Sequence, residues 1–568
     1  MIAQGKLSRL VPIENAAMEN RRVIQWDKDD LESLRLLKVD VLALGMLTAI
    51  RRTLDMVDAL PGRREHYGAT AKLAMQNLPD DDTETYDMIC RAETIGVFQI
   101  ESRAQQSMLP RLRPREYYDL VIQVAIVRPG PIQGGMVHPY LQRREAKRNG
   151  NTDCVTYPGP EVKAVLERTL GVPIFQEQVM EIAMKAGDFT ADDADRLRRD
   201  MAAWKRKGNL TQHQERLVHA MVVKRRYDPA FVEALCKQME GFAEYGFPES
   251  HAAGFAKLAY VSSFLKCHEP AAFFAALLNS QPMGFYSPSQ LVQEARRSHV
   301  RVLPADVTAS VWDSTLHPRA DGETGEDGLV QPDIRLGLNR IRGMRKPAAE
   351  RIEAARAQAP FTSVEDLAHR AALDRHDLNV LAAANALKSL AGHRRQALWQ
   401  TLALQEPGHD HALLRQARPV EAPLELPAPP IGEEVMADYG SLGLSLQSHP
   451  VELLRARLER MRFATAATLA GYRNGQLARA CGIVTVRQRP GTANGTIFVS
   501  IEDETGAINV VLWPHLIERQ RREVLNAQLL GVYGKWQCER ETRHLVAQHL
   551  VDLTPLLGRL ATSSRDFH

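Results

Sequence analysis

Six prolines fall within residues 407–430, and this segment constrains the fold of the whole chain most strongly. Proline fixes φ and lacks a backbone N–H, so proline at this density excludes both a helix and a central strand. The segment is therefore predicted to be a linker between separately folded parts. The chain has 568 residues, too many for one hydrophobic core, and three or four domains are expected. The prolines are Pro407, Pro419, Pro423, Pro427, Pro429 and Pro430.

Composition narrows the class of protein. Hydrophobic residues make up 44% of the chain and charged residues 25%, values typical of soluble globular proteins. No run of 18 apolar residues occurs, and the first residues, M-I-A-Q-G-K-L-S-R-L-V-P, lack the apolar core of a signal peptide. The six cysteines are far apart and form no C-x-x-C pair, which excludes the common zinc spacings and indicates a reducing, cytoplasmic setting.

The residues up to about 299 are predicted to be mainly helical. A strand at 38–42 precedes a turn at Gly45 and then a helix with apolar residues at Leu47, Ile50, Leu54 and Val57, the helical period. Further helices are predicted for A-K-L-A-M-Q-N-L (71–78) and for H-A-A-G-F-A-K-L-A-Y-V-S-S-F-L-K (251–266).

Residues 300–345 show short strand patterns around a turn-rich loop at 319–328, followed by more helix to about residue 404. After the linker, a helical stretch at 450–471 precedes a β-rich unit of about 80 residues. Its strands are C-G-I-V-T-V-R, T-I-F-V-S-I-E-D, A-I-N-V-V-L-W and L-L-G-V-Y-G-K-W, with a helical E-V-L-N-A before the last. About five short strands with one helical insertion are typical of an OB-type barrel.

Asp40 stands within an apolar stretch, L-L-K-V-D-V-L-A-L-G-M-L, where a buried carboxylate is costly unless it is paired or binds a metal. At the end of a strand beside a turn, it is a candidate catalytic metal ligand. The alternative is a capping or ion-paired aspartate with Lys38 as its partner. A two-metal site needs two or three carboxylates, so Asp40 alone is not sufficient.

Two D-x-D patterns are possible partners for Asp40, and both are better interpreted as acidic first turns of helices. Asp27 and Asp29 lie in W-D-K-D-D, directly before a helix start at Asp30. Asp193 and Asp195 open a helix after Thr190.

Several basic residues are candidate phosphate contacts, because guanidinium groups and lysines suit triphosphate or a nucleic-acid backbone. The alternative for the basic run R-L-R-R-D-M-A-A-W-K-R-K-G is a solvated helix. His251, in Y-G-F-P-E-S-H, precedes a helix, and Arg128 opens the rigid turn R-P-G-P-I-Q-G-G, which is not a Walker loop. The basic run holds Arg196, Arg198, Arg199, Lys205 and Lys207. Taken by itself, the segment that begins at Arg128 is better interpreted as a plain turn, and a lone histidine such as His251 is more often structural.

The segment L-G-L-N-R-I-R-G-M-R-K is shaped like a helix–hairpin–helix turn, which presents backbone N–H groups to DNA phosphates. Its candidate duplex contacts are Arg340, Arg342, Arg345 and Lys346. In the barrel, aromatic side chains are candidate stacking platforms for single-stranded bases, although half of them are expected in the core. These are Phe498, Trp513, Tyr533 and Trp536.

The order of these features resembles the C-terminal half of the bacterial family C DNA polymerases, the DNA polymerase III alpha subunit family. The segments that carry the resemblance run from end to end of the chain. The forms V-P-I-E-N-A-A-M-E and K-V-D-V-L-A-L-G-M-L are similar to the error-prone branch. The other matching segments are Q-W-D-K-D-D-L, G-V-F-Q-I-E-S-R, V-R-P-G-P-I-Q-G-G-M-V, P-I-F-Q-E-Q-V-M, Y-G-F-P-E-S-H and L-G-L-S-L-Q-S-H-P.

The resemblance implies a multi-domain α+β fold. Its expected domains are the end of the palm (1–57), helical fingers (58–299), a helix–hairpin–helix domain (300–404), a Pro-rich linker and helical connector (405–472), an OB-fold (473–556) and a tail (557–568). It also implies template-directed DNA synthesis of the error-prone, translesion type, linked to DNA repair. Asp40 would be the third palm aspartate, a ligand of Mg²⁺. In the fingers, the resemblance implies candidate nucleotide or template contacts at Arg128, Arg196, Arg198, Arg199, Lys205, Lys207 and His251. The implied partners are primer–template DNA, deoxynucleoside triphosphates and accessory proteins that link the chain to a sliding clamp, with no membrane.

The chain departs from the family pattern in one respect. The motif P-D-x-D-x-D-F, which carries the first two palm aspartates, does not occur in these 568 residues, and neither does the N-terminal phosphoesterase-like domain. The sequence is therefore expected to be inactive by itself. The alternatives are a catalytically inactive remnant that binds primer–template DNA, one half of a split polymerase, and a repair scaffold that meets partners through its C-terminal region.

Overall fold

A computed structural model describes most of the chain. The described residues are 5–15, 22–26, 28–34, 43–128, 135–151, 155–198, 210–245, 248–284, 286–319, 330–404, 424–489, 493, 495–539, 542–558, 560 and 565–567. They form two compact units, Met1–Gly45 and Met46–His568, and each is described by itself. Within the described ranges, every helix is too short or too polar to cross a membrane.

The first unit contains a small hairpin and a short helix. Strands β1 (Ile13–Asn15) and β2 (Arg22–Ile24) pair antiparallel, after the 3₁₀ turn η1 (Leu7–Arg9). Helix α1 (Lys28–Ser33) confirms the helix start predicted around Asp30. The strand expected at 38–42, which holds Asp40, lies outside the described residues.

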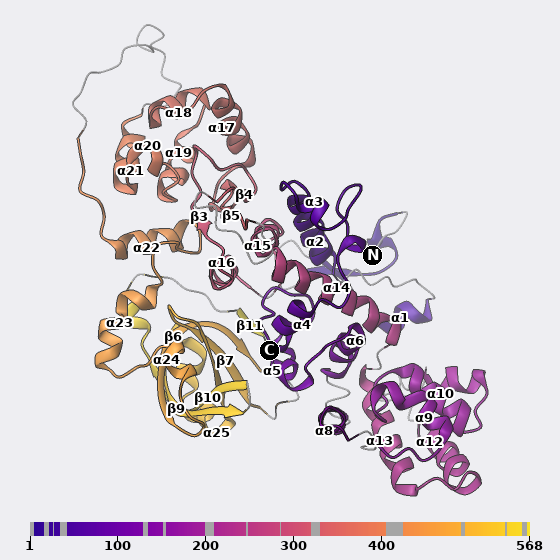
Figure 1. The fold of residues 1–568 in the computed structure, drawn as a ribbon. Coiled ribbons are helices and arrows are strands. Elements are labelled where there is room, and N and C mark those ends of the chain that lie inside the picture. Colours follow the sequence, from indigo (N-terminus) through magenta and orange to yellow (C-terminus); the bar gives the residue numbers. More distant parts are fainter. Residues whose placement is uncertain are drawn as a thin grey trace. The chain divides into compact units, whose positions relative to one another are not determined.

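Helix α14 (Glu249–His268) organises the helical region and confirms the long helix predicted at 251–266. It packs against α6 (Tyr117–Ile126), α4 (Thr83–Cys90) and α15 (Pro270–Asn279) (Figure 1). Phe264 and Leu265 enter one hydrophobic core, whereas Phe255 and Tyr260 enter a second. Because both sides of α14 are covered, its apolar residues do not form a single stripe.

The remaining helices of this region complete the two cores. Helix α2 (Leu44–Asp58) buries Ile50, Leu54 and Val57 as predicted, but Leu47 is 40% exposed. The others are α3 (Arg63–His66), α5 (Arg103–Leu112), α8 (Val137–Arg148), α9 (Pro160–Leu166), η3 (Glu167–Thr169), α10 (Gln176–Ala186), the helical residues 191–198, α12 (Leu210–Val218), the π-helical turn η4 (His219–Lys224), α13 (Pro229–Tyr245) and α16 (Pro288–Arg297).

The helix predicted for 71–78 is wrong. Only the 3₁₀ turn η2 (Met75–Asn77) forms there, although the composition favours helix. Side chains take over the backbone donors: the Leu73 N–H donates to Asp58 Oδ1 (2.9 Å), and the Ala74 N–H donates to Asn77 Oδ1 (3.0 Å). Tertiary hydrogen bonds and the burial of Leu73 and Leu78 therefore override the local preference.

Residues 302–403 form a small sheet followed by a bundle of short helices. The sheet has the order β3-β5-β4, from β3 (Val302–Leu303), β4 (Thr315–His317) and β5 (Asp333–Arg335), with β3 parallel to β5. The helical elements are η5 (Leu338–Arg340), α17 (Lys346–Gln358), α18 (Val364–Arg370), α19 (Arg375–Ala383), α20 (Lys388–Ala391) and α21 (Arg394–Ala403). One hydrophobic core joins this bundle to the preceding helices, because Phe264, Leu277, Ile334 and Ile352 belong to a single cluster.

The residues on the two sides of the proline-rich segment are held together by buried ion pairs. Helix α22 (Ile431–Ser441) follows residues 424–430, which form no regular element, and 405–423 lie outside the described residues. Arg394 of α21 donates to Glu434 Oε2 at 2.6 Å and also to Asp438, both on α22. Helix α22 is therefore anchored to the bundle that precedes the linker.

The C-terminal part is a closed five-stranded barrel, as predicted. Its strands are β6 (Leu477–Gln488), β7 (Ile497–Glu502), β8 (Ala507–Leu512), β9 (Leu529–Glu539) and β10 (Thr542–Asp552). The strands pair in the order β6-β7-β8-β10-β9, and β6 also pairs with β9, which closes the barrel. Strands β8 and β10 are parallel. Strand β11 (Arg565–Phe567) pairs with β6. Helices α23 (Pro450–Arg460) and α24 (Ala466–Ala470) precede the barrel, α25 (Pro514–Arg519) and α26 (Arg521–Asn526) separate β8 from β9, and the turn η6 (Thr554–Leu557) follows β10.

Candidate nucleic-acid interface

Four predicted site residues lie outside the described residues: Asp40, Arg199, Lys205 and Lys207. The structure places the others in three regions, namely the helices around α14, the hairpin before α17 and the barrel. These regions are taken in that order.

Arg196 and Arg198 lie in the helical residues 191–198. Thr190 caps this segment, because its Oγ1 accepts the Asp193 N–H (3.2 Å) while Asp193 Oδ2 accepts the Thr190 N–H (3.1 Å). This geometry confirms the acidic helix start. Both arginines are exposed, but Arg198 forms an ion pair with Asp195 at 3.0 Å, so the two arginines are not equivalent as anion contacts.

Arg128 and His251 flank the same helical region but make different contacts. Arg128 is half-buried at the end of the chain segment after α6, and its Nε donates to the Val124 carbonyl (3.2 Å). Burial lowers the pKa of Arg128. His251 lies in the first turn of α14, with its ring 4.2 Å from the Phe255 ring between centroids. Both side chains are therefore partly engaged within the protein.

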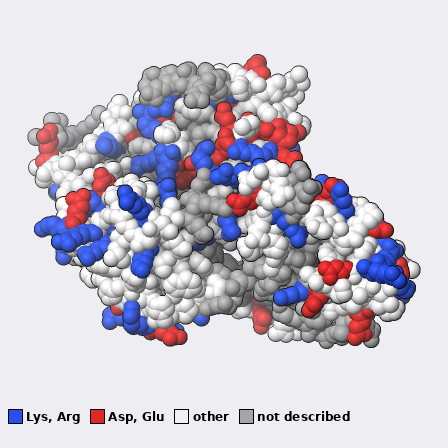
Figure 2. Space-filling model, turned by 60° about the horizontal axis from the view of Figure 1, so that its bottom comes forward, with Lys and Arg blue, Asp and Glu red and all other residues white. Residues whose placement is uncertain are grey.

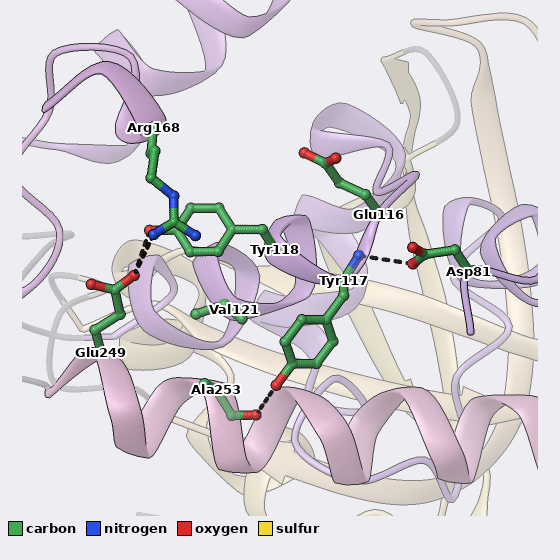
Figure 3. Close-up of a pocket in the computed structure, with 8 residues that line it drawn as sticks. All are labelled: Asp81, Glu116, Tyr117, Tyr118, Val121, Arg168, Glu249 and Ala253. Atoms are coloured by element: carbon green, nitrogen blue, oxygen red, sulfur yellow. Dashed lines mark hydrogen bonds and ion pairs between the residues drawn. The ribbon is translucent and has the colours of Figure 1, made fainter. Parts of the chain in front are cut away.

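A cavity of about 370 Å³ opens between α6, η3 and the first turns of α14 (Figure 3). The Arg168 guanidinium carbon lies 3.8 Å from the centroid of the Tyr118 ring. Glu249 Oε1 accepts the Tyr118 hydroxyl at 2.8 Å and lies 3.5 Å from Arg168 Nη1. The Tyr117 hydroxyl donates to the Ala253 carbonyl at 2.5 Å. Of the lining residues, only Glu249 belongs to a motif noted in the sequence, Y-G-F-P-E-S-H, because the lining comes from four separated segments.

The charge of this cavity does not favour direct binding of a triphosphate. Three carboxylates line it, from Asp81, Glu116 and Glu249, against the single guanidinium of Arg168. The Asp81 carboxylate is held by the Tyr86 hydroxyl (2.9 Å) and by the Tyr117 N–H (3.1 Å). A polyanion would meet net repulsion there, so the cavity does not gather the basic residues that the sequence singled out.

The predicted hairpin connects β5 to α17 through η5 and a turn at Gly343, whose φ of +81° favours glycine. A second glycine is required by space. A Cβ on Gly337 would lie 2.4 Å from the Trp312 carbonyl oxygen. Residues 336–345 therefore form a tight glycine-dependent turn ahead of a 13-residue helix, as the pattern predicts.

The four basic residues of this hairpin differ in how far they are engaged. Arg340 is half-buried and burial lowers its pKa, while Arg342 donates through Nη1 to the Gly440 carbonyl (3.1 Å). Arg345 forms ion pairs with Asp377 (2.6 Å) and with Asp374. Lys346 is exposed, and its ammonium nitrogen is 3.9 Å from Glu350. Lys346 is therefore the side chain of this set best placed to meet a phosphate.

The aromatic side chains of the barrel divide into exposed and buried groups. Trp513, at the end of β8, is 46% exposed. Phe498 on β7 is half-buried, and the Arg103 guanidinium carbon lies 5.0 Å from its ring centroid. Tyr533 is half-buried beside Arg479, at 5.0 Å. Trp513 thus offers the most accessible ring.

The stacking prediction for Trp536 is wrong. Its side chain is 4% exposed and belongs to the barrel core with Leu530 and Leu545. In β9, alternate side chains face the interior, and the register of this strand turns Trp536 inward. A ring enclosed in this way cannot stack on a base.

Charges of both signs are interspersed on the surface, with Lys and Arg gathered in several groups on the face drawn in Figure 2. The net charge of the chain is only +3. Attraction of a nucleic acid would therefore depend on local groups of basic side chains rather than on the overall charge.

Family models match the chain in the order that the fold suggests. The matches are to the Bacterial DNA polymerase III alpha NTPase domain (residues 1–43), the Bacterial DNA polymerase III alpha subunit finger domain (46–225), a Helix-hairpin-helix motif (299–397) and an OB-fold nucleic acid binding domain (478–553). Two of these models, over residues 1–43 and 46–225, describe domains of the bacterial DNA polymerase III alpha subunit. This confirms the resemblance seen in the sequence.

Curated relatives match the chain from end to end. They include proteins named Error-prone DNA polymerase from Ralstonia nicotianae (89% identical over 568 residues), Burkholderia pseudomallei (59% over 570) and Bordetella bronchiseptica (60% over 574). Each comparison covers 100% of this chain and 52% of the relative. The chain therefore spans about half the length of the curated relatives it matches.

One group of side chains in the described residues is arranged like metal ligands, and it contains none of the predicted site residues. It consists of Glu84, Cys267 and His268. No local sequence pattern links the three residues, because 183 positions separate Glu84 from Cys267. The adjacent Cys-His pair at the end of a predicted helix was the only available signal.

Proposed function

We propose that this chain forms the fingers, helix–hairpin–helix and OB-fold part of an error-prone DNA polymerase and binds primer–template DNA during template-directed synthesis. The observation that carries the proposal is the end-to-end match to relatives named Error-prone DNA polymerase, at up to 89% identity. The order of the matched domains supports it.

The proposed reaction is attack of the primer 3′-hydroxyl on the α-phosphate of a deoxynucleoside triphosphate. A divalent metal, proposed to be Mg²⁺, would stabilise negative charge on the attacking and leaving oxygens. Asp40 is the proposed ligand from this chain. The proposed triphosphate or template contacts remain Arg128, Arg196, Arg198, Arg199, Lys205, Lys207 and His251.

Primer–template binding is proposed to use two surfaces with different chemistry. Around Lys346, the hairpin would meet duplex phosphates through its ammonium group and the N-terminal backbone of α17. Trp513 would stack on bases of the single-stranded template beyond the duplex. These two side chains are favoured because both are exposed and lie in the domains whose models match nucleic-acid-binding modules.

A binding experiment tests the DNA-binding part of the proposal. Fluorescence anisotropy with a labelled primer–template should give saturable binding whose affinity falls linearly on a log–log plot against salt concentration. The variant Asp40→Ala should bind DNA as well as the unchanged chain. Affinity that is absent, or independent of salt, would contradict the proposal.

Primer extension separates polymerisation from DNA binding alone. The second candidate function is binding of primer–template without synthesis, because a two-metal site needs more carboxylates than Asp40 alone. We expect no extension by this chain alone with Mg²⁺ and four nucleotides. Robust extension that is abolished by Asp40→Ala would show that the chain needs no further aspartates.

We further propose that the protein acts in translesion DNA repair in the cytoplasm and reaches the sliding clamp through accessory proteins. Deletion of the gene should lower damage-induced mutagenesis, and a complementing copy should restore it. Capture of the clamp by the purified chain, without any other protein, would contradict the indirect recruitment.

A further inference from the structure

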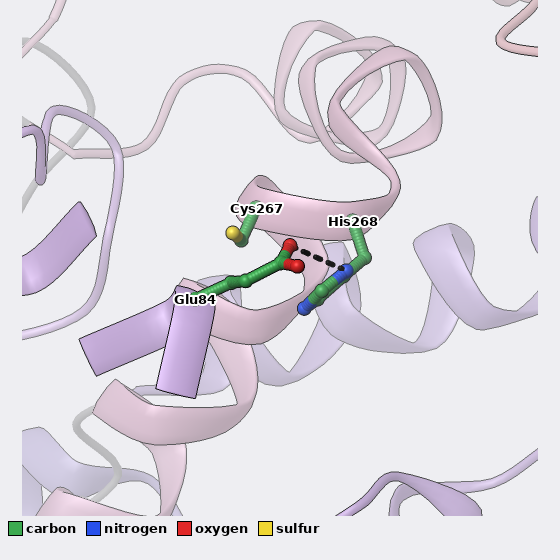
Figure 4. A group of neighbouring side chains, drawn as sticks. All are labelled: Glu84, Cys267 and His268. Carbon is green, nitrogen blue, oxygen red and sulfur yellow. Dashed lines mark ion pairs between the residues drawn. The ribbon is translucent and has the colours of Figure 1, made fainter. Parts of the chain in front are cut away.

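The group Glu84, Cys267 and His268 lies at the junction of two helices (Figure 4). Glu84 belongs to the first turn of α4, and Cys267 and His268 belong to the last turn of α14. One potential ligand atom from each residue lies within 4.8 Å of those from the other two. The group thus brings a carboxylate, a thiol and an imidazole to one point, a set of ligands that Zn²⁺ binds.

His268 is held in an orientation typical of a metal ligand. Its Nε2 lies 2.9 Å from Asp82 Oδ2. The same Oδ2 atom accepts the Thr85 N–H at 2.8 Å, so the Asp82 carboxylate is held in place by the start of α4. Because a carboxylate accepts hydrogen bonds, Nε2 is the ring nitrogen that donates to Asp82, and Nδ1 is the ring nitrogen left to face a metal ion. A carboxylate behind a histidine in this way is the usual outer partner of a metal-bound imidazole.

The other ring nitrogen of His268, Nδ1, lies near the Glu84 carboxylate (Figure 4). Nδ1 of His268 is 4.0 Å from Glu84 Oε2, too far for a hydrogen bond. Two ligands each about 2.0–2.1 Å from a zinc ion are at most ~4 Å apart, and closer in tetrahedral geometry. The observed separation fits an ion between the two atoms after a small rotation of the exposed Glu84 side chain.

The thiol of Cys267 completes the set. Cys267 precedes His268 in the last turn of α14, and its Sγ lies within 4.8 Å of the ligand atoms of Glu84 and His268. The carboxylates of Glu84 and Asp82 attract a cation to this point, and the charge of a bound cation would deprotonate the thiol. Cys267 also lies at the C-terminal end of a 20-residue helix, where the helix dipole favours positive charge.

We propose that Glu84, Cys267 and His268 bind one divalent cation of the Zn²⁺ class, with Asp82 orienting His268 and water as the fourth ligand. Such an ion would join the start of α4 to the end of α14. This site is separate from the proposed metal at Asp40 in both sequence and chemistry, because Mg²⁺ prefers oxygen ligands and does not bind thiolate. The inference does not depend on the proposed function.

Cobalt titration of the chelator-treated full chain tests the proposal, because Co²⁺ reports thiolate ligation by a near-ultraviolet charge-transfer band. We expect one Co²⁺ per chain, displaced by Zn²⁺ but not by excess Mg²⁺. The band should vanish in Cys267→Ala and persist in the matched control Cys538→Ala. A band that survives Cys267→Ala, or no thiolate band at all, would overturn the site.

Two further variants keep the test decisive if Cys267→Ala folds poorly. Glu84 is exposed, so Glu84→Ala should leave the fold intact and lower the affinity for Zn²⁺ at least tenfold, measured in competition with a chromophoric chelator. Asp82→Asn retains the helix cap on Thr85 and should lower the affinity for Zn²⁺ about 10–100-fold. Zn²⁺ affinity that is unchanged in both variants would contradict the proposal.

Discussion

Lys266 Nζ lies 2.8 Å from Glu294 Oε1, and both side chains are less than a tenth exposed. Lys266 comes from α14 and Glu294 from α16, so the pair joins two helices inside the helical region. Lys266 also donates to the Ile95 carbonyl (3.1 Å), and Arg297 approaches Glu294 Oε2 at 3.2 Å. A buried pair with these additional bonds is costly to break from one side.

Removal of Lys266 should destabilise the protein strongly. We expect Lys266→Ala to lower the free energy of unfolding by about 3–5 kcal/mol, because Glu294 is left buried without its main partner. The matched control is Lys185→Ala, whose partner Glu181 lies at 3.1 Å with both side chains well exposed. That loss should be below about 1 kcal/mol. Urea unfolding followed by tryptophan fluorescence measures both, and equal losses would contradict the difference in burial.

His449 should make stability depend on pH below neutrality. Its Nδ1 accepts the Val451 N–H (3.2 Å) at the start of α23, and burial lowers its pKa to about 4. Because this pKa is depressed from about 6.5, the contribution to stability is present above pH 6.5 and is lost as the pH falls toward 4. The loss should reach about 2–3 kcal/mol at pH 4.5.

The variant His449→Asn isolates that contribution, because asparagine caps a helix without titrating. Urea unfolding of both proteins from pH 7.5 to pH 4.5 gives the difference directly. The stability of the unchanged protein should fall relative to the variant across this range. A constant difference would mean that His449 does not titrate as its burial requires.

Lys346 and Arg345 are neighbours in the sequence but should respond differently to substitution. Lys346→Ala should weaken primer–template binding several-fold and reduce the slope of the salt dependence by about 1, with no change in the melting temperature. Arg345→Ala should lower the melting temperature, because it leaves Asp377, a fully buried carboxylate, with a weaker partner. Anisotropy and thermal melting distinguish the two, and a larger loss of DNA affinity in Arg345→Ala would reverse our assignment.

Substitution of the two barrel tryptophans should affect different properties, DNA affinity at Trp513 and stability at Trp536. Trp513→Ala should reduce affinity for single-stranded DNA by about 1–3 kcal/mol, the contribution of one stacked base, and leave unfolding unchanged. Trp536→Ala should lower the stability of the barrel by about 3–5 kcal/mol, because it empties a large core position. Trp536→Phe should cost less, since the buried Trp536 Nε1 has no hydrogen-bond acceptor among the described residues. Oligonucleotide titration and denaturation provide the two readouts.

Much of the fold could be predicted from local patterns. The apolar run of 251–266 predicted α14, the alternation in the C-terminal region predicted four barrel strands, and Thr190 followed by acids predicted a helix start. Each pattern works because the side chains that decide the structure are within a few residues of one another. Strand β10 was not singled out, although it pairs with both β9 and β8 and runs parallel to β8.

The site could be predicted only in part, because its chemistry depends on burial and pairing. Nothing in the sequence near Arg345 shows that Asp374 and Asp377 occupy its guanidinium. The roles of Asp40, Arg199, Lys205 and Lys207 stay predictions, since these residues lie outside the described ranges.

The sequence by itself determined the family resemblance, the order of the matched segments and the turns that require glycine or proline, because these depend on short motifs and backbone preferences. Tertiary structure decided that residues 71–78 would not form an α-helix and that Trp513 would be exposed while Trp536 is buried. It also decided that Glu84 would meet Cys267 and His268. The physical reason is that solvent exposure and ion pairing are set by contacts between residues far apart in the chain, which no local pattern encodes.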